Sequence, residues 1–121
     1  MLTAIAVPQA TKLLDRIHVK GAVMDVEMMF SSARHLAIAR SAQSTVDIDT
    51  ARHTIYLSVG ADTVRNRDVG AEHGVQLSAS RAHMSYAATG IGYGAANLSV
   101  VVRRRSAVDT VFVSRLGRVR H

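Results

Sequence analysis

Residues 9–43 carry a heptad-like apolar pattern, and this pattern constrains the fold more than any other feature of the 121-residue chain. Apolar or small residues recur there in alternating steps of four and three, at Val19, Val23, Val26, Phe30, Ala33 and Ala37. Such spacing places these side chains on one face of an α-helix. The pattern therefore predicts one long amphipathic helix that ends near residues 41–45.

The same helix is predicted to carry a second apolar stripe beside the first. This second, adjacent stripe consists of Leu13, Ile17, Met24 and Met28. Gly21 interrupts the helix at a cost of about 1 kcal/mol relative to alanine, so a bend is expected there. Pro8 stands near the start of the pattern, where a kink or a first-turn position would accommodate it.

After residue 43 the apolar period changes from nearly four to two, as expected of half-buried strands. The strand candidates are residues 46–48, 55–59, 75–78, 83–86, 98–102 and 108–114. Residues 60–74 are predicted to form a loop with at most a short strand, and residues 103–107 a hairpin loop. Residues 116–121 form either a last short strand or a loose end.

These elements predict an α+β fold in which a long N-terminal helix packs on a small antiparallel β-sheet domain. The helix occupies residues 1–43 and the β domain residues 44–121. Hydrophobic residues make up 48% of the chain and charged residues 20%, which is the balance of a folded protein. The chain has no cysteine, which excludes disulfides and thiolate chemistry.

The sequence offers no positive support for an enzyme or for a bound cofactor. The six histidines are scattered, without the short spacings of zinc sites, and are expected on the surface. The glycine-rich residues 90–95 half resemble a dinucleotide fingerprint, but a strand rather than a helix follows them. The chain also lacks a G-x-S-x-G nucleophile motif. A non-enzymatic protein without metal or cofactor is therefore predicted.

Positive charge is concentrated at the C-terminal end of the chain. From Asn97 onward, six arginines and one aspartate give a net charge of +5, against +6 for the whole chain. Clustered arginines are typical of surfaces that contact phosphate backbones. The alternative is a solvated hairpin loop and tail that keep a sheet edge from aggregating.

Four segments resemble the GspH/FimT-type pseudopilins, the minor subunits of type II secretion systems and type IV pili. Residues 4–8 resemble the second half of a pilin's hydrophobic N-terminal helix with its proline. Residues 30–40 contain A-R-x-x-A-x-x-R, and residues 86–90 resemble an F-x-x-x-G turn with tyrosine in the first place. Residues 111–120 resemble the closing strand and its terminal G-R-x-R.

The resemblance implies a single-pass inner-membrane subunit with its β domain in the periplasm. Such a subunit is built into a pseudopilus of a type II secretion system, or a related type IV pilus, and acts in protein export. Its partners are other pseudopilins, and we expect them to pack against the first helix stripe, Val19 to Ala37. Residues 1–8 are expected to be the remnant of a membrane segment whose leader and first half are missing, through a late start site or a truncated gene.

Some members of this family serve DNA uptake, and in those the terminal G-R-x-R contacts DNA. A DNA-binding minor pilin is therefore the alternative function. By the match to this motif, Gly117, Arg118 and Arg120 are its candidate contacts. The same basic region adds Arg103, Arg104, Arg105 and Arg115 to the candidate DNA-binding residues.

Overall fold

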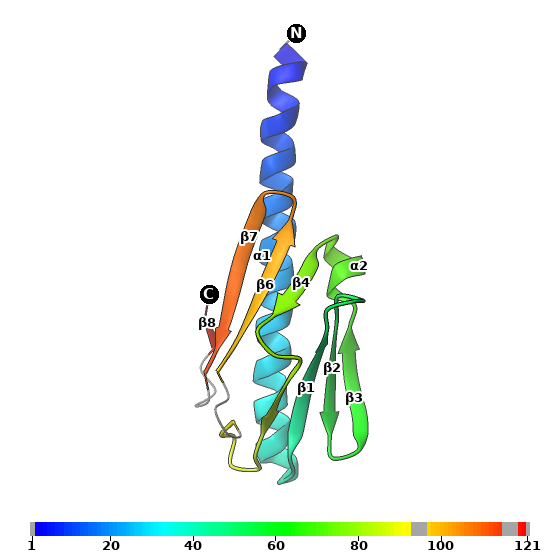
Figure 1. Ribbon diagram of the computed structural model, residues 1–121, viewed down its shortest axis with the longest axis vertical. Coiled ribbons are helices and arrows are strands. Elements are labelled where there is room, and N and C mark those ends of the chain that lie inside the picture. Colours follow the sequence, from blue (N-terminus) through cyan, green and yellow to red (C-terminus); the bar gives the residue numbers. More distant parts are fainter. Residues whose placement is uncertain (1, 93–96, 115–118, 121) are drawn as a thin grey trace.

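The computed structural model describes residues 2–92, 97–114 and 119–120, with side chains described for residues 9–92 and 97–114. Helix α1 (Leu2–Arg40) runs the length of the molecule, and its first turns extend beyond the β strands (Figure 1). The helix continues past both Pro8 and Gly21. None of the helices in the described part of the chain reaches the length and hydropathy that a membrane span requires.

The C-terminal end of α1 is closed by a Schellman motif. The N–H of Ser41 donates to the carbonyl oxygen of Ile38, and the N–H of Ala42 donates to that of Ala37. Ser41 takes the left-handed conformation, with φ of 50°, that this motif requires after the last helical residue. The predicted end of the helix near residues 41–45 thus has a local hydrogen-bonding cause.

Two four-stranded antiparallel sheets follow the helix. The first contains β1 (Ser44–Asp49), β2 (Thr54–Val59), β3 (Asp62–Arg67) and β5 (His83–Tyr86), in the order β3-β2-β1-β5. The second contains β4 (Gln76–Ala79), β6 (Leu98–Arg104), β7 (Ala107–Val113) and β8 (Val119–Arg120), in the order β4-β6-β7-β8. A short helix, α2 (Val69–His73), connects β3 to β4.

The core lies between one face of α1 and the inner faces of both sheets. Strand residues alternate between buried and more exposed positions, as in β6, where Leu98, Val100 and Val102 are buried. Strands of both sheets, including β1, β2, β6 and β7, contact α1 (Figure 1). The helix therefore holds the two sheets together, and the predicted α+β architecture is confirmed.

Residues 60–74 differ from the predicted loop, because they form the six-residue strand β3 and the helix α2. The side chains of β3 are exposed or half-buried and mostly polar, so the sequence shows no apolar alternation there. Its pairing with β2 at the sheet edge forms the strand instead. The hairpin loop is also shorter than the predicted 103–107: β6 and β7 leave only Arg105 and Ser106 between them.

The ring of His53 links the two sheets. The N–H of Leu77 in β4 donates to His53 Nδ1 at 3.0 Å, and the N–H of Gly70 donates to the His53 carbonyl oxygen at 2.9 Å. A Cβ on Gly70 would lie 2.6 Å from the His53 Cβ, so a larger residue would push this contact apart. His53 is half-buried and has a structural role, which corrects the expectation of a surface histidine.

Candidate functional site

The first helix stripe faces the sheets. The side chains of Val19, Val23, Val26, Phe30, Ala33 and Ala37 are at most 4% exposed and belong to the core. Side chains buried in this way are not available to another subunit. The prediction that this stripe forms the assembly face is therefore corrected, since the stripe holds the helix on its own β domain.

A different apolar stripe of α1 faces solvent. It consists of Leu13, Ile17, Met24, Met28 and Ile38, each 45–59% exposed, and we call it the outer stripe. A helix turns by about 100° per residue, so Met24 and Met28, each two residues from Val26, point about 160° away from it. The two stripes thus lie on opposite sides of α1, not beside each other as predicted. The β domain buries one of the two apolar faces of α1, so the other apolar face stays exposed and can pack against another protein.

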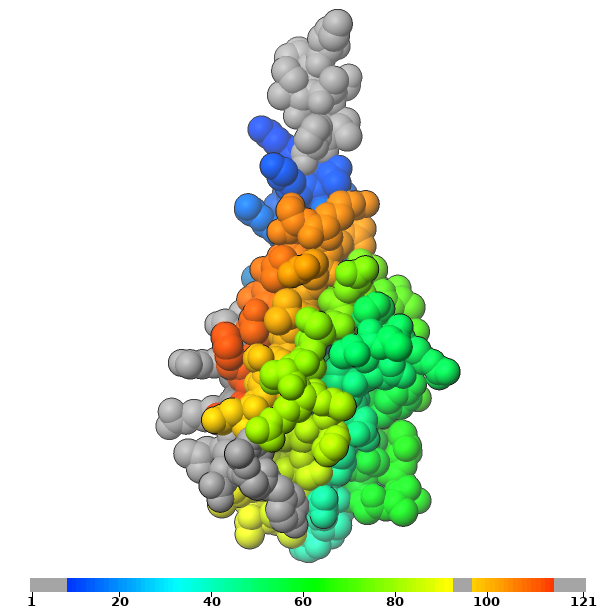
Figure 2. Space-filling model, in the orientation of Figure 1, coloured from blue at the N-terminus to red at the C-terminus, as the bar shows by residue number. Residues whose placement is uncertain are grey.

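Basic residues border the N-terminal half of the outer stripe. Lys12, Arg16 and Lys20 are all exposed. The blue side chains of this part of α1 project beside the hairpin formed by β6 and β7 (Figure 2). The exposed surface of this part of α1 is therefore apolar along the outer stripe and positively charged beside it.

Asp15 anchors this part of α1 to the β6–β7 hairpin. Its Oδ1 accepts hydrogen bonds from Arg104 Nε at 2.8 Å and from Arg105 Nη1 at 2.6 Å. The hydrogen bond from Arg104 and the positive charges of both arginines lower the pKa of Asp15 below its ordinary value of 3.8, although burial opposes the shift. The position of Asp15, four residues before Val19 and in phase with the buried stripe, is the sequence signal for this ion pair.

A second ionic cluster holds β3 and α2 against α1. Arg67 Nη2 lies 2.8 Å from Asp25 Oδ2 and 2.8 Å from Glu72 Oε2, and His73 Nε2 lies 2.6 Å from Asp25 Oδ2. Burial raises the pKa of Asp25, but the hydrogen bonds and charges of His73 and Arg67 outweigh it and leave the pKa lowered. Gly21 makes room for this contact, because a Cβ there would lie 3.1 Å from the His73 ring.

The same cluster contains three groups that a metal ion could use. Ligand atoms of Asp25, Glu72 and His73 lie within 4.8 Å of one another. The guanidinium of Arg67 already bonds to both carboxylates and supplies the positive charge that a metal would bring. We therefore interpret the cluster as an ion-pair network of the fold. Sequence spacing could not indicate it, because Asp25 lies more than 40 residues before Arg67, Glu72 and His73.

The structure brings together only part of the predicted DNA-binding set. Arg103 is exposed, but Arg104 and Arg105 are engaged with Asp15. These three arginines line a small hollow of about 350 Å³ with Gly74 and Gln76. Of the remaining candidates, Arg115, Gly117 and Arg118 lie outside the described residues. Arg120 belongs to β8, opposite Phe112, and only its backbone is described.

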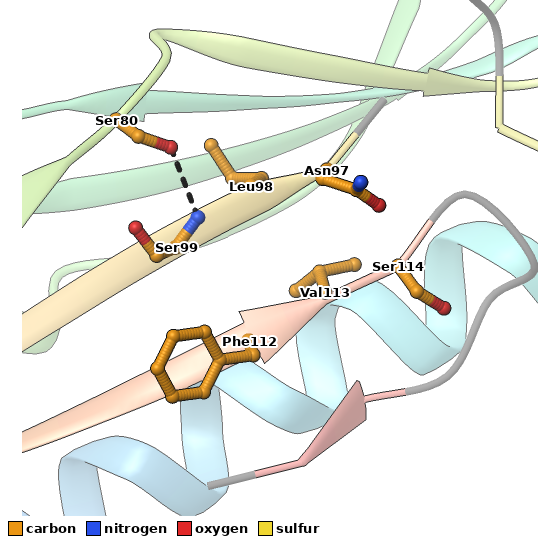
Figure 3. Close-up of a pocket in the computed structure, with 7 residues that line it drawn as sticks. All are labelled: Ser80, Asn97, Leu98, Ser99, Phe112, Val113 and Ser114. Carbon is orange, nitrogen blue, oxygen red and sulfur yellow. Dashed lines mark hydrogen bonds between the residues drawn. The ribbon is translucent and has the colours of Figure 1, made fainter. Parts of the chain in front are cut away.

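A shallow hollow of about 600 Å³ lies at the end of β6 and β7 (Figure 3). The phenyl ring of Phe112 lies along β7 on one side, and on the other side Ser80 Oγ accepts a hydrogen bond from the Ser99 N–H at 3.0 Å. The remaining lining residues are Asn97, Leu98, Val113 and Ser114. None of these seven residues is an acid, a base or a cysteine, so they offer no acid–base or metal chemistry.

No protein-family model and no curated protein sequence matches the chain. Solved structures do resemble it. A crystal structure of the type IV minor pilin FimU from Pseudomonas aeruginosa superposes with a TM-score of 0.74, at 14% identity, over 89% of this chain and 90% of FimU. The minor pseudopilin EpsH of the Vibrio cholerae type 2 secretion system superposes with a TM-score of 0.65, at 11% identity, over 85% of this chain and 94% of EpsH. The chain thus has the fold seen in these minor pilin and pseudopilin structures.

Proposed function

We propose that this chain is a non-enzymatic minor pilin or pseudopilin that packs against other pilin-like subunits through the outer stripe of α1. The observation that carries this proposal is the exposure of the outer stripe on a helix whose opposite face is already buried. Covering five large apolar side chains in a helix–helix contact is favourable, because burying each such side chain fully is worth about 1.5–3 kcal/mol.

The fold comparisons support a structural role of this kind. FimU is a minor pilin of a type IV pilus, and EpsH is a minor pseudopilin of a secretion system. By analogy with EpsH we assign the chain to a pseudopilus that acts in protein export. In this proposal α1 carries the β domain on the periplasmic side of the inner membrane, and the segment that includes residues 1–8 leads into the membrane.

The test is a bacterial two-hybrid screen against pilin-like proteins encoded nearby. Met28→Asp places a charge in the outer stripe and should abolish the contacts, while the folding stability changes by only about 0.5 kcal/mol because the site is exposed. Val64→Asp in β3 is the matched control, since Val64 is also an exposed apolar residue but lies on a different surface. Phe30→Asp should instead unfold the domain.

The absence of cysteine makes a second test specific. A single Met24→Cys variant can crosslink only through the outer stripe, and we expect adducts with a neighbouring subunit carrying a cysteine on its own helix. Preserved contacts in Met28→Asp, together with no adducts from Met24→Cys, would show that the outer stripe is not the assembly surface.

DNA binding by the C-terminal arginines is the second candidate function. The chain from Asn97 onward carries a net charge of +5, and this clustering of positive charge favours DNA binding. The engagement of Arg104 and Arg105 with Asp15 leaves Arg103 and the tail arginines as the residues on which this function would depend.

A further inference from the structure

The outer edge of β7 is open along most of its length. β7 pairs with β6 from Ala107 to Val113, but on its other side β8 covers only Phe112 and Val113. Within the described part of the chain, residues 107–111 therefore have no partner strand on that side. Unpaired strand edges are sites at which another extended chain can add.

The register shows which backbone groups face this open edge. Arg105 and Ser106 form a two-residue turn, so Arg104 and Ala107 are the closing hydrogen-bonded pair of the hairpin. Hydrogen-bonded and non-hydrogen-bonded pairs alternate along an antiparallel ladder. The N–H and C=O groups of Val108 and Thr110 consequently point away from β6, toward the open edge.

A hydrogen bond at Thr110 agrees with this assignment. The Thr110 N–H donates to Oδ1 of the preceding residue, Asp109, at 2.8 Å, and not to a strand. The carboxylate caps one of the outward N–H groups. The neighbouring outward N–H, that of Val108, has no such side-chain cap among the described hydrogen bonds. The edge is thus protected at one position and available at the next.

A groove of about 460 Å³ lies beside this edge. One wall is α1, with Arg16, Val19 and Lys20, and the other is the start of β7, from Ser106 to Asp109. The α1 side chains stand next to the orange β6–β7 hairpin in Figure 2. A strand added to β7 would therefore lie between the hairpin and the basic flank of the helix.

The charge and the side-chain pattern of this groove indicate its partner. Arg16 and Lys20 are exposed cations, whereas Asp109, the acidic residue in the lining, is bonded to Thr110. Val108 and Phe112, each 49% exposed, project from the outer face of the same strand. Alternate residues of an added strand point to opposite faces, so acidic side chains could face the helix while apolar ones cover Val108.

We propose that this groove binds an extended acidic segment of a partner protein, which adds as a strand to the free edge of β7. Main-chain hydrogen bonds to the N–H and C=O of Val108 and to the C=O of Thr110 hold the segment, and carboxylates paired with Arg16 and Lys20 select it. The groove adjoins the basic flank of the outer stripe, but none of the five outer-stripe residues lines it, so strand addition here does not require the proposed helix contact.

The experiment measures fluorescence anisotropy of a labelled heptapeptide of alternating valine and glutamate with the intact chain. Val108→Pro removes an outward N–H and also replaces the valine side chain. Sheet edges tolerate proline, so the variant should fold but bind the peptide about tenfold more weakly. Asp109→Ala frees the Thr110 N–H and removes a negative charge, so it should strengthen binding. Circular dichroism and thermal melts confirm that each variant is folded.

Charge selectivity is measured with the double variant Arg16→Glu and Lys20→Glu, which leaves β7 untouched. It should also lose about tenfold or more in affinity, because two attractive pairs become repulsive. The matched control, Arg40→Glu with Arg81→Glu, reverses two exposed charges outside the groove and should bind normally. This arm decides the proposal even if Val108→Pro does not fold.

Three results would overturn the proposal. The first is equal binding of the peptide by folded Val108→Pro and by the parent chain. The second is binding of a valine–lysine peptide as tightly as the valine–glutamate peptide, which would show that the groove does not select an acidic partner. The third is a dimer in sedimentation velocity that Val108→Pro dissolves, because the edge would then be occupied by a second copy of this chain.

Discussion

Arg34 of α1 donates a hydrogen bond from Nε to the carbonyl oxygen of Gly90 at 3.2 Å, across 56 residues of sequence. This bond joins two of the segments that resemble pseudopilins, the A-R-x-x-A-x-x-R helix end and the turn after Tyr86. Gly90 has φ of +86°, and its N–H closes the turn on the carbonyl oxygen of Ala87 at 2.8 Å. The turn is thereby fixed against the end of the helix.

Gly90→Ala is expected to destabilise the protein. A Cβ at this position would lie 2.7 Å from Ile38 Cδ1, and the positive φ adds about 1–2 kcal/mol of backbone strain. Gly60→Ala is the matched control, because Gly60 has φ of +61° but open space around its Cβ position. Chemical denaturation should show a larger loss for Gly90→Ala. Equal losses would mean that the turn is not pressed against α1.

Much of the fold could be predicted because period and polarity are local properties. The helical period identified α1, and strand-like patterns identified β1, β2, β4, β5, β6 and β7 to within a few residues. Strand β3 could not be found in this way, because an exposed polar edge strand carries no apolar signal. Its formation depends on the neighbouring strand β2.

The candidate site was harder to predict than the fold. Two apolar stripes were visible on α1, but periodicity does not tell which stripe faces the sheets. Val26 and Met28 are both apolar, yet Val26 is buried and Met28 is 57% exposed. The partners of Asp15 could not be identified either, because Arg104 and Arg105 follow it by about 90 residues.

Tyr86→Phe is expected to stabilise the protein by about 1 kcal/mol. The side chain of Tyr86 is fully buried, and its hydroxyl has no hydrogen-bond partner among the described residues. Removing an unsatisfied buried hydroxyl removes its desolvation penalty without leaving a large cavity. Phenylalanine is also the first residue of the turn motif that this segment resembles. A lower midpoint for Tyr86→Phe in urea would reveal a partner for the hydroxyl.

The alkaline stability of the protein provides an independent measurement on Tyr86. Burial raises its pKa from 10.0 to about 12. Between these values the unfolded chain loses the phenolic proton while the folded chain keeps it, so stability falls as the pH rises. The two-unit shift in pKa corresponds to a loss of roughly 2–3 kcal/mol in the free energy of unfolding. Tyr86→Phe should not lose this stability at high pH. If the stabilities of the two proteins fell in parallel with pH, the loss could not be attributed to Tyr86.

Asp15→Asn should lower the melting temperature at neutral pH, because it removes the charge that pairs with Arg104 and Arg105. The pKa of Asp15 is lowered in the folded state, so its contribution is present above the unfolded value of 3.8. The contribution is lost as the pH falls through the lower folded pKa. The difference between Asp15→Asn and the parent chain should therefore shrink in acid. Asp47→Asn, at an exposed position of β1, is the control and should change little.

Arg103, Arg118 and Arg120 remain candidates for DNA binding. Replacing Arg103, Arg118 and Arg120 together with alanine should weaken binding to duplex DNA if this function exists. Each lost phosphate contact should reduce the slope of log affinity against log salt by about 0.9. The control replaces Arg52 and Arg81, which are exposed in other parts of the molecule. Absence of binding to duplex DNA by the parent chain at about 50 mM salt would remove this alternative.

The same triple variant distinguishes a binding role of these arginines from a structural one. Arg103 is exposed, and DNA binding requires the tail arginines to be exposed as well. Exposed charges contribute about 0–1 kcal/mol to stability, so under the binding interpretation the melting temperature should stay near that of the parent chain. Arg104→Ala should behave differently, because Arg104 bonds to Asp15 and to the carbonyl oxygens of His73 and Gly74. Unfolding of the triple variant would mean that the substituted arginines have a structural role and do not serve binding alone. The DNA-binding interpretation of the terminal G-R-x-R would then lose its main support.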